Sequence, residues 1–204
     1  MSGIIAQNSG RHTGLVKTTS SAGTWNLIKT YTASSDADLT FVDGTDDVDF
    51  TAYDMFVFKF INIHPETNTA DFQVNFRDED SAYDATKTTH IFVASHTEAD
   101  ATSLARQDVD VANSTAAQVL AYSLNGDADG SLSGELKLWN PSSTTFTKNF
   151  GSRVTYMHSE PASYDAYMGG YCTQDDPSKA IDGVQFTMST DSIQSGQISL
   201  YGIS

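Results

Sequence analysis

The chain is a succession of short apolar runs separated by polar turns. Residues 72–76 alternate between apolar and polar side chains at period two, which is typical of a half-buried strand. Residues 24–31 show the same alternation, with Trp25 and Leu27 on one predicted face. The run at 55–61 is denser in aromatic residues and too short for a persuasive helix, so it is interpreted as a central strand. Further runs lie at 39–42, 91–93, 132–139, 146–156, 167–172, 184–188 and 198–201, so nine or ten strands are predicted.

Two segments depart from this pattern. Residues 98–124 are rich in Ala and Gln, and we expect a short helix or a long surface loop there. Residues 1–23 contain four glycines and a Ser/Thr tail, a composition that favours an extended segment. We therefore predict an all-β fold, a jelly-roll-like antiparallel β-sandwich over residues 24–204, preceded by an N-terminal anchoring arm over residues 1–23. A chain of 204 residues is long enough for one such domain.

The charge of the chain argues against several classes of partner. Eleven Lys and Arg against 26 Asp and Glu give a formal charge of -15, which opposes association with nucleic-acid phosphates and anionic membrane surfaces. No 18-residue apolar stretch and no secretion-signal pattern occur, so we expect a soluble chain without membrane insertion. The single cysteine, Cys172, excludes an intrachain disulfide and lies in an apolar run, where a buried inert thiol is expected.

The N-terminal arm differs from the rest of the chain in charge. Arg11 and Lys17 are its only charged side chains, whereas residues 24–204 carry 9 bases and 26 acids. We expect the arm to dock on a neighbouring subunit; the alternative is a segment that packs on its own domain or stays mobile. The residues expected to make the anchoring contact are Ile4, Ile5, Arg11, Leu15, Val16 and Lys17.

One turn has the spacing of a calcium loop. Asn125, Asp127 and Asp129 place side-chain oxygens at alternate positions, followed by a glycine. An EF-hand would need an acid at its twelfth position, which is Leu136, while Glu135 lies one residue early. An ordinary hairpin turn is the favoured interpretation, with a structural calcium site as the alternative. No other cofactor is predicted.

The motifs of catalysis are missing from the sequence. There is no Gly-x-Ser-x-Gly elbow and no phosphate-binding glycine loop. His90 and His96 lie six residues apart, which in a continuous strand separates them by about 20 Å. Four carboxylates crowd residues 43–49, where a solvated loop is the favoured interpretation. We therefore predict that the protein is not an enzyme.

Aromatic residues offer a different chemistry, because an exposed ring gives a sugar an apolar face and a polar tip. Candidates are Tyr156, Tyr164 and Tyr167, with Tyr171 and Trp139 nearby in sequence. In a β-sandwich most such rings fill the core, and this is the competing interpretation.

Phrases along almost the whole chain resemble one group of proteins. They include SGIIAQNSGRHTGLVK (2–17), TWNLIKTYTAS (24–34), NIHPETNTADFQ (62–73), SGELKLWNPSSTTF (133–146), AIDGVQFTMS (180–189) and SGQISLYGI (195–203). The group comprises virion proteins of marine and other environmental tailed bacteriophages. The resemblance implies a structural component of the phage particle and assigns no activity to particular residues.

The resemblance and the composition together suggest a role. We expect a decoration, cement or accessory protein of the virion, assembled in the host cytoplasm, whose arm clips onto a capsid or tail subunit. A homo-oligomer is expected, with a trimer slightly favoured. The alternative is a tail-fibre or receptor-binding subunit that recognises a host-surface glycan.

Overall fold

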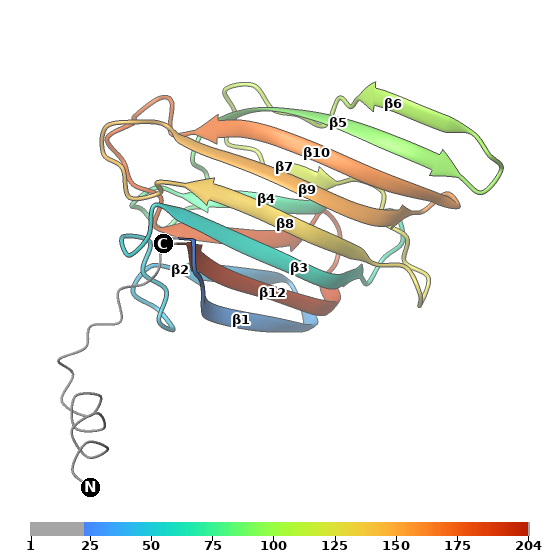
Figure 1. Ribbon diagram of the computed structural model, residues 1–204, viewed down its shortest axis with the longest axis horizontal. Coiled ribbons are helices and arrows are strands. Elements are labelled where there is room, and N and C mark those ends of the chain that lie inside the picture. The colour runs from blue at the N-terminus through green and yellow to red at the C-terminus, as the bar shows by residue number, and fades with distance from the viewer. Residues whose placement is uncertain (1–22, 204) are drawn as a thin grey trace, which may run out of the picture.

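The computed structural model describes residues 23–203, which form two antiparallel sheets packed face to face (Figure 1). The larger sheet has the strand order β1-β12-β3-β8-β9-β10-β5-β6, and the smaller has the order β2-β11-β4-β7. The strands are β1 (Trp25–Asp36), β2 (Asp38–Val42), β3 (Met55–Pro65), β4 (Phe72–Arg77), β5 (Lys87–Thr97), β6 (Thr102–Arg106), β7 (Gln118–Ala121), β8 (Leu132–Trp139), β9 (Lys148–His158), β10 (Ala162–Cys172), β11 (Gly183–Met188) and β12 (Ile193–Ile203).

The chain passes repeatedly between the two sheets. From β2 onward, β2, β4, β7 and β11 enter the smaller sheet, while β3, β5–β6, β8–β10 and β12 enter the larger. This wrapping is the connectivity of a jelly roll, with the meander β8–β9–β10 in one strand position and both β12 and β1 added beyond β3 at one edge. The predicted all-β sandwich is confirmed. The predicted arm lies outside the described residues, apart from Gly23.

Phenylalanine rings join the two sheets. Phe186 of β11 has its ring centroid 5.2–6.3 Å from those of Phe41, Phe58, Phe60 and Phe72, and all five rings are buried. Phe58 and Phe60 come from the larger sheet and the other three from the smaller. Most of these pairs are edge-to-face, the arrangement that the ring quadrupole favours. Phe186 is therefore the centre of the packing between the sheets.

The prediction for residues 98–124 holds only for residues 107–117, which form a loop between β6 and β7, and the described residues hold twelve strands instead of nine or ten. No helix occurs there; β6 pairs with β5 as an exposed edge strand, and β7 is buried along its whole length. Gln118 is a weak strand former, but its buried amide donates to the Val119 and Val109 carbonyls and accepts from Thr89. Tertiary hydrogen bonds here outweigh local propensity.

The predicted alternation in β1 is interrupted. A bulge lies between Leu27 and Lys29 in the pairing of β1 with β12. Trp25 and Leu27 are therefore 47% and 58% exposed, while Ile28 and Tyr31 pack against the core. A bulge shifts the side-chain parity of a strand, and an alternating sequence does not reveal it.

Two buried lysines bind loops to the larger sheet. Lys87 and Lys148 flank Cys172 on its inner face, and all three are fully buried. Lys87 Nζ donates to the Ala116 carbonyl and Lys148 Nζ to the Pro177 carbonyl, each at 2.9 Å. Burial lowers the pKa of Lys87 to about 8, lowers the pKa of Lys148, and raises the pKa of the Cys172 thiol to about 12. The predicted burial of Cys172 is confirmed, and its lack of reactivity stays a prediction.

Candidate functional site

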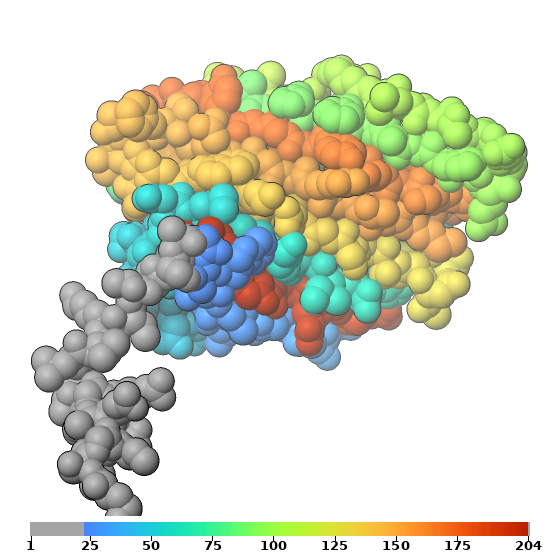
Figure 2. All heavy atoms as spheres, in the orientation of Figure 1, coloured from blue at the N-terminus to red at the C-terminus, as the bar shows by residue number. Residues whose placement is uncertain are grey.

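The outer side of the larger sheet, called here the open face, is not covered by any described element (Figure 2). Successive side chains of a strand point to opposite sides, so every second residue of each strand lies on this face. The strand pairing places one row of residues across all eight strands. In order from β1 to β6 the row is Thr30, Ser199, Lys59, Glu135, Arg153, Tyr167, Phe92 and Arg106.

Exposed apolar side chains gather on the open face. Of the eight large hydrophobic residues exposed among the described residues, only Phe146 lies elsewhere, in the loop before β9. The other seven are Trp25, Leu27, Ile61, Phe92, Leu104, Trp139 and Tyr171. Scattered apolar residues are normal on a protein surface, but their concentration on one face indicates an interaction surface.

Two glycines on the open face are covered by the aromatic rings of neighbouring residues. Gly151 and Gly169 are paired across β9 and β10. The Trp139 ring lies at van der Waals distance from Gly151, 3.7 Å from the position of a Cβ, and the His90 ring lies against Gly169. Rings that cover glycines fill the space of the missing side chains, which keeps them close to the sheet. Trp139 remains 39% exposed and so presents part of its ring to solvent.

A second pair of rings lies beside these. Phe92 and Tyr167 stack with centroids 5.0 Å apart and planes 5° apart. The Arg153 guanidinium lies 4.9 Å from the Tyr167 centroid, and its Nη2 donates to Asp165 Oδ2 at 2.9 Å. The Tyr167 hydroxyl donates to the same carboxylate. Burial raises the pKa of Asp165, but hydrogen bonds from Arg153 and Tyr167 outweigh it and hold that pKa below its usual value.

A charged group lies nearer β1. Lys59 and Lys137 both pair with the Glu135 carboxylate, the second at 2.8 Å. Burial raises the pKa of Glu135, but hydrogen bonds from the two ammonium groups outweigh it, so that pKa is lowered. Lys59 Nζ also lies 5.2 Å from the Trp25 ring, which contacts Tyr201 edge-to-face at 5.6 Å. Two ammonium groups thus share one carboxylate, and the group has a net positive charge.

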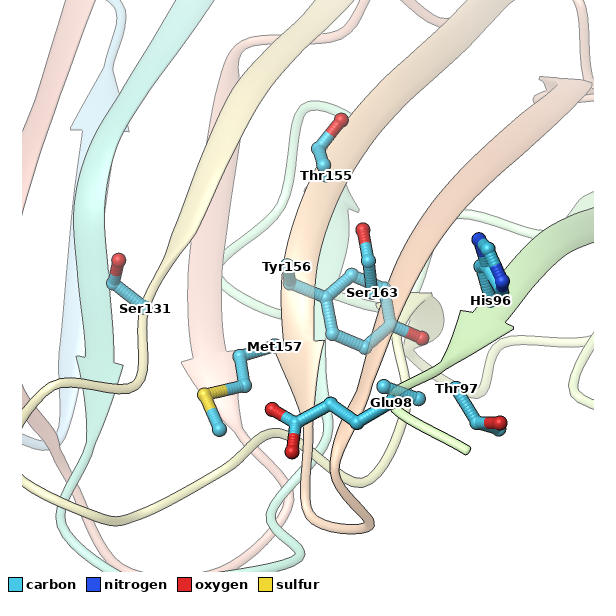
Figure 3. Close-up of a pocket in the computed structure, with 9 residues that line it drawn as sticks. His96, Thr97, Glu98, Ser131, Thr155, Tyr156, Met157 and Ser163 are labelled. Carbon is cyan, nitrogen blue, oxygen red and sulfur yellow. The ribbon is translucent and has the colours of Figure 1, made fainter. Parts of the chain in front are cut away.

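Two adjoining hollows mark the open face. One, of about 570 Å³, is bordered by Lys59, Glu135, Arg153 and Tyr201 and by the hydroxyls of Ser133, Ser199 and Thr155. The other, of about 490 Å³ and drawn in Figure 3, lies at the ends of β5, β9 and β10. It is bordered by His96, Glu98, Ser131, Ser163, Thr155 and Met157, among others. Thr155 borders both hollows, which therefore adjoin along β9.

The structure does not bring the three predicted glycan-contact tyrosines together. Tyr167 lies on the open face, whereas Tyr156 and Tyr164 point inward from β9 and β10. Tyr156 is 3% exposed, and burial raises its pKa. Tyr164 stacks on His158 at 4.3 Å and contacts Tyr122. Glycan contact by these tyrosines stays a prediction, and of the three only Tyr167 is placed on an uncovered face.

Trp139 and Tyr171, which the sequence suggested as aromatic contact residues, lie on the open face. Phe92, Trp25 and His90 also lie there, but the sequence did not suggest them as contact residues. Phe92 lies in the middle of the apolar run 91–93, which by itself does not distinguish a buried residue from an exposed one. The available signal was the alternation within residues 88–96, where Thr89, Ile91 and Val93 are the buried set. That alternation places Phe92 on the other face of the strand.

The predicted calcium residues form a local turn. Asn125 is 4% exposed; its Oδ1 accepts from the Asp127 backbone N–H at 2.7 Å, and its Nδ2 donates to the Asp127 carboxylate. These bonds close a local turn. The favoured interpretation as a hairpin was wrong, because the flanking strands β7 and β8 lie in different sheets. Calcium binding at Asn125, Asp127 and Asp129 stays a prediction. Within residues 23–203, the one group of three carboxylates close enough to share an ion is Asp78, Asp80 and Asp84. Asp78 there already pairs with a lysine, Lys179, at 3.5 Å.

Comparison of the chain with models of protein families, with curated proteins and with solved structures found no match. Within residues 23–203, no helix is long and apolar enough to cross a membrane. The predicted anchoring residues, Ile4, Ile5, Arg11, Leu15, Val16 and Lys17, lie outside the described residues.

Proposed function

We propose that this protein is a non-enzymatic structural component of a bacteriophage particle, a decoration, cement or accessory protein held by its N-terminal arm. The open face carries this proposal, because a solid sandwich that gathers seven of its eight exposed large apolar side chains on one face is built for surface contact. The resemblance of residues 2–17 and 24–34 to tailed-phage virion proteins supports the particle as the place of that contact.

The proposed arm can be separated from the sandwich at a defined point. β1 begins at Trp25, so deletion of residues 1–23 leaves every described strand intact. We expect the shortened protein to keep its far-ultraviolet circular dichroism spectrum and its unfolding midpoint, and to be lost from purified particles. An unfolded product, or a folded product that still joins the particle, would contradict the anchoring role. Light scattering on the full chain tests the proposed homo-oligomer, for which a trimer is favoured.

A second candidate function is a tail-fibre or receptor-binding subunit that recognises a host-surface glycan. The observation that favours it is the combination of exposed rings and hydroxyl-lined hollows on the open face. Imaging of intact particles distinguishes the two candidates. Hundreds of copies on the head would support the decoration role, whereas a few oligomers on the tail would support receptor binding.

A further inference from the structure

The middle of the open face combines rings, hydroxyls and charges in a way that points to one class of ligand. Trp139 and Tyr171 lie on one side of the paired glycines Gly151 and Gly169, and the stacked rings of Phe92 and Tyr167 lie on the other. A sugar ring binds to such surfaces by laying its C–H face on an aromatic ring while its hydroxyls bond to polar neighbours. The hydroxyls that border the two hollows supply such neighbours.

The face is long enough for an extended chain. Tyr201 on β12 and Tyr167 on β10 are separated by β3, β8 and β9. Adjacent strands lie about 4.8 Å apart, so these two aromatic positions are about 19 Å apart across the sheet. A ligand of several linked sugar rings can therefore contact both ends, and each added contact strengthens binding by effective concentration.

The charge of this region is opposite in sign to that of the whole molecule. The described residues contain 9 bases and 26 acids. The middle of the open face nevertheless has three bases, Lys59, Lys137 and Arg153, against two carboxylates, Glu135 and Asp165. A further carboxylate, Glu98, borders the second hollow beyond the end of β5 and lies outside this group. The side chains of the three bases are 38%, 38% and 61% exposed, so they remain accessible to a ligand. A locally positive surface on an acidic protein favours an anionic ligand.

We propose that the open face binds an acidic polysaccharide, with Phe92, Trp139, Tyr167 and Tyr171 contacting the sugar rings and Lys59, Lys137 and Arg153 contacting its carboxylate or sulfate groups. This inference rests on the second candidate function; it concerns the open face, which the first candidate function also uses, and leaves the anchoring by the N-terminal arm unaffected. The middle of the face offers rings interleaved with paired charges, whereas the exposed leucines, Leu27 and Leu104, lie on the edge strands. A protein partner would instead be expected to bury a contiguous apolar centre.

Calorimetric titration of the full chain tests the proposal with three acidic polysaccharides, alginate, polygalacturonate and hyaluronate, and with neutral dextran. We expect at least one acidic polymer to bind and dextran not to bind. Trp139→Ala and Lys137→Gln should each weaken binding at least tenfold. Matched controls away from the face, Phe146→Ala and Lys29→Gln, should change it less than twofold. Unchanged circular dichroism spectra and unfolding midpoints establish that each variant is folded.

Several outcomes would overturn the proposal. These are no binding to any of the three acidic polymers, equal binding to dextran, or binding that Lys137→Gln leaves unchanged. Light scattering that shows Trp139→Ala dissociating an oligomer would assign the face to a second copy of the chain instead. Incorporation of Trp139→Ala into particles separates the two functions. The expected result is that Trp139→Ala still joins particles but no longer binds the polysaccharide.

Discussion

The buried ammonium of Lys87 makes a quantitative prediction about stability and pH. Lys87 is fully buried, and its Nζ donates to the carbonyls of Thr115 and Ala116 at 3.3 and 2.9 Å. No carboxylate pairs with it among the ion pairs of the described residues. Burial without a countercharge lowers its pKa from 10.5 to about 8. We propose Lys87→Met, which keeps the apolar stem and removes the titrating group.

The sign follows from proton binding in the two states. Between pH 8 and 10.5 the unfolded chain keeps the lysine proton while the folded protein has released it. Stability rises with pH wherever the unfolded state binds more protons, so this lysine makes the free energy of unfolding increase between pH 8 and 10.5. The shift corresponds to about 3 kcal/mol, of which about 2 to 3 kcal/mol is gained between pH 7 and pH 10. The free energy of unfolding of the native protein minus that of Lys87→Met should rise by this amount.

Urea unfolding at pH 7, 8, 9 and 10 measures this difference. The subtraction removes the contribution of every other titrating group that the two proteins share. Lys29→Met removes a more exposed ammonium on β1, and its difference from the native protein should stay flat to within about 0.5 kcal/mol. If the difference for Lys87→Met is equally flat, the buried charge does not cost folding energy and the reasoning is wrong.

Three further predictions concern packing. Phe186→Ala removes the ring at the centre of the packing between the sheets and should cost about 3 to 5 kcal/mol in urea unfolding, and a cost under about 1 kcal/mol would contradict that role. Gly202→Ala would place its Cβ 2.2 Å from the Tyr53 ring and should cost about 1 to 3 kcal/mol, whereas Gly151→Ala, whose Cβ would lie 3.5 Å from its nearest neighbour, should be nearly neutral in the same assay. Cys172 should resist a thiol reagent at pH 8 until urea unfolds the protein; rapid labelling of the native protein would show that its strand opens locally.

The strands that the sequence predicts best are those in which buried and more exposed residues alternate strictly. Phe72, Val74 and Phe76 are all fully buried on one side of β4, as their spacing requires. Gln118 and Lys87 are also fully buried, but nothing local marks them, because the Gln118 amide oxygen and the Lys87 ammonium have partners 29 residues away in sequence. Burial of a polar side chain depends on tertiary partners, and a single sequence does not display those partners.

The candidate site was predictable only in part, for a related reason. Tyr164 and Tyr167 are three positions apart in one strand, so side-chain alternation alone places them on opposite faces. Which face remains uncovered depends on how the sheets pack, and the Phe92 ring that stacks on Tyr167 comes from β5, which pairs with β10 across a long sequence separation. The open face could therefore be recognised only once the order of the strands was known.

The pairing of β1 with β12 has a consequence for the order of folding. Thr30 and Ser199 share a hydrogen bond across 169 residues of chain, and β1 has no other strand neighbour in its sheet. During synthesis β1 therefore emerges early and must wait for nearly the whole chain before its ladder can form. Such non-local pairing slows folding and leaves apolar residues such as Trp25 uncovered meanwhile. A chain stalled before β12 would present both β1 and β3 as unpaired edges, the state in which this protein is most exposed to aggregation.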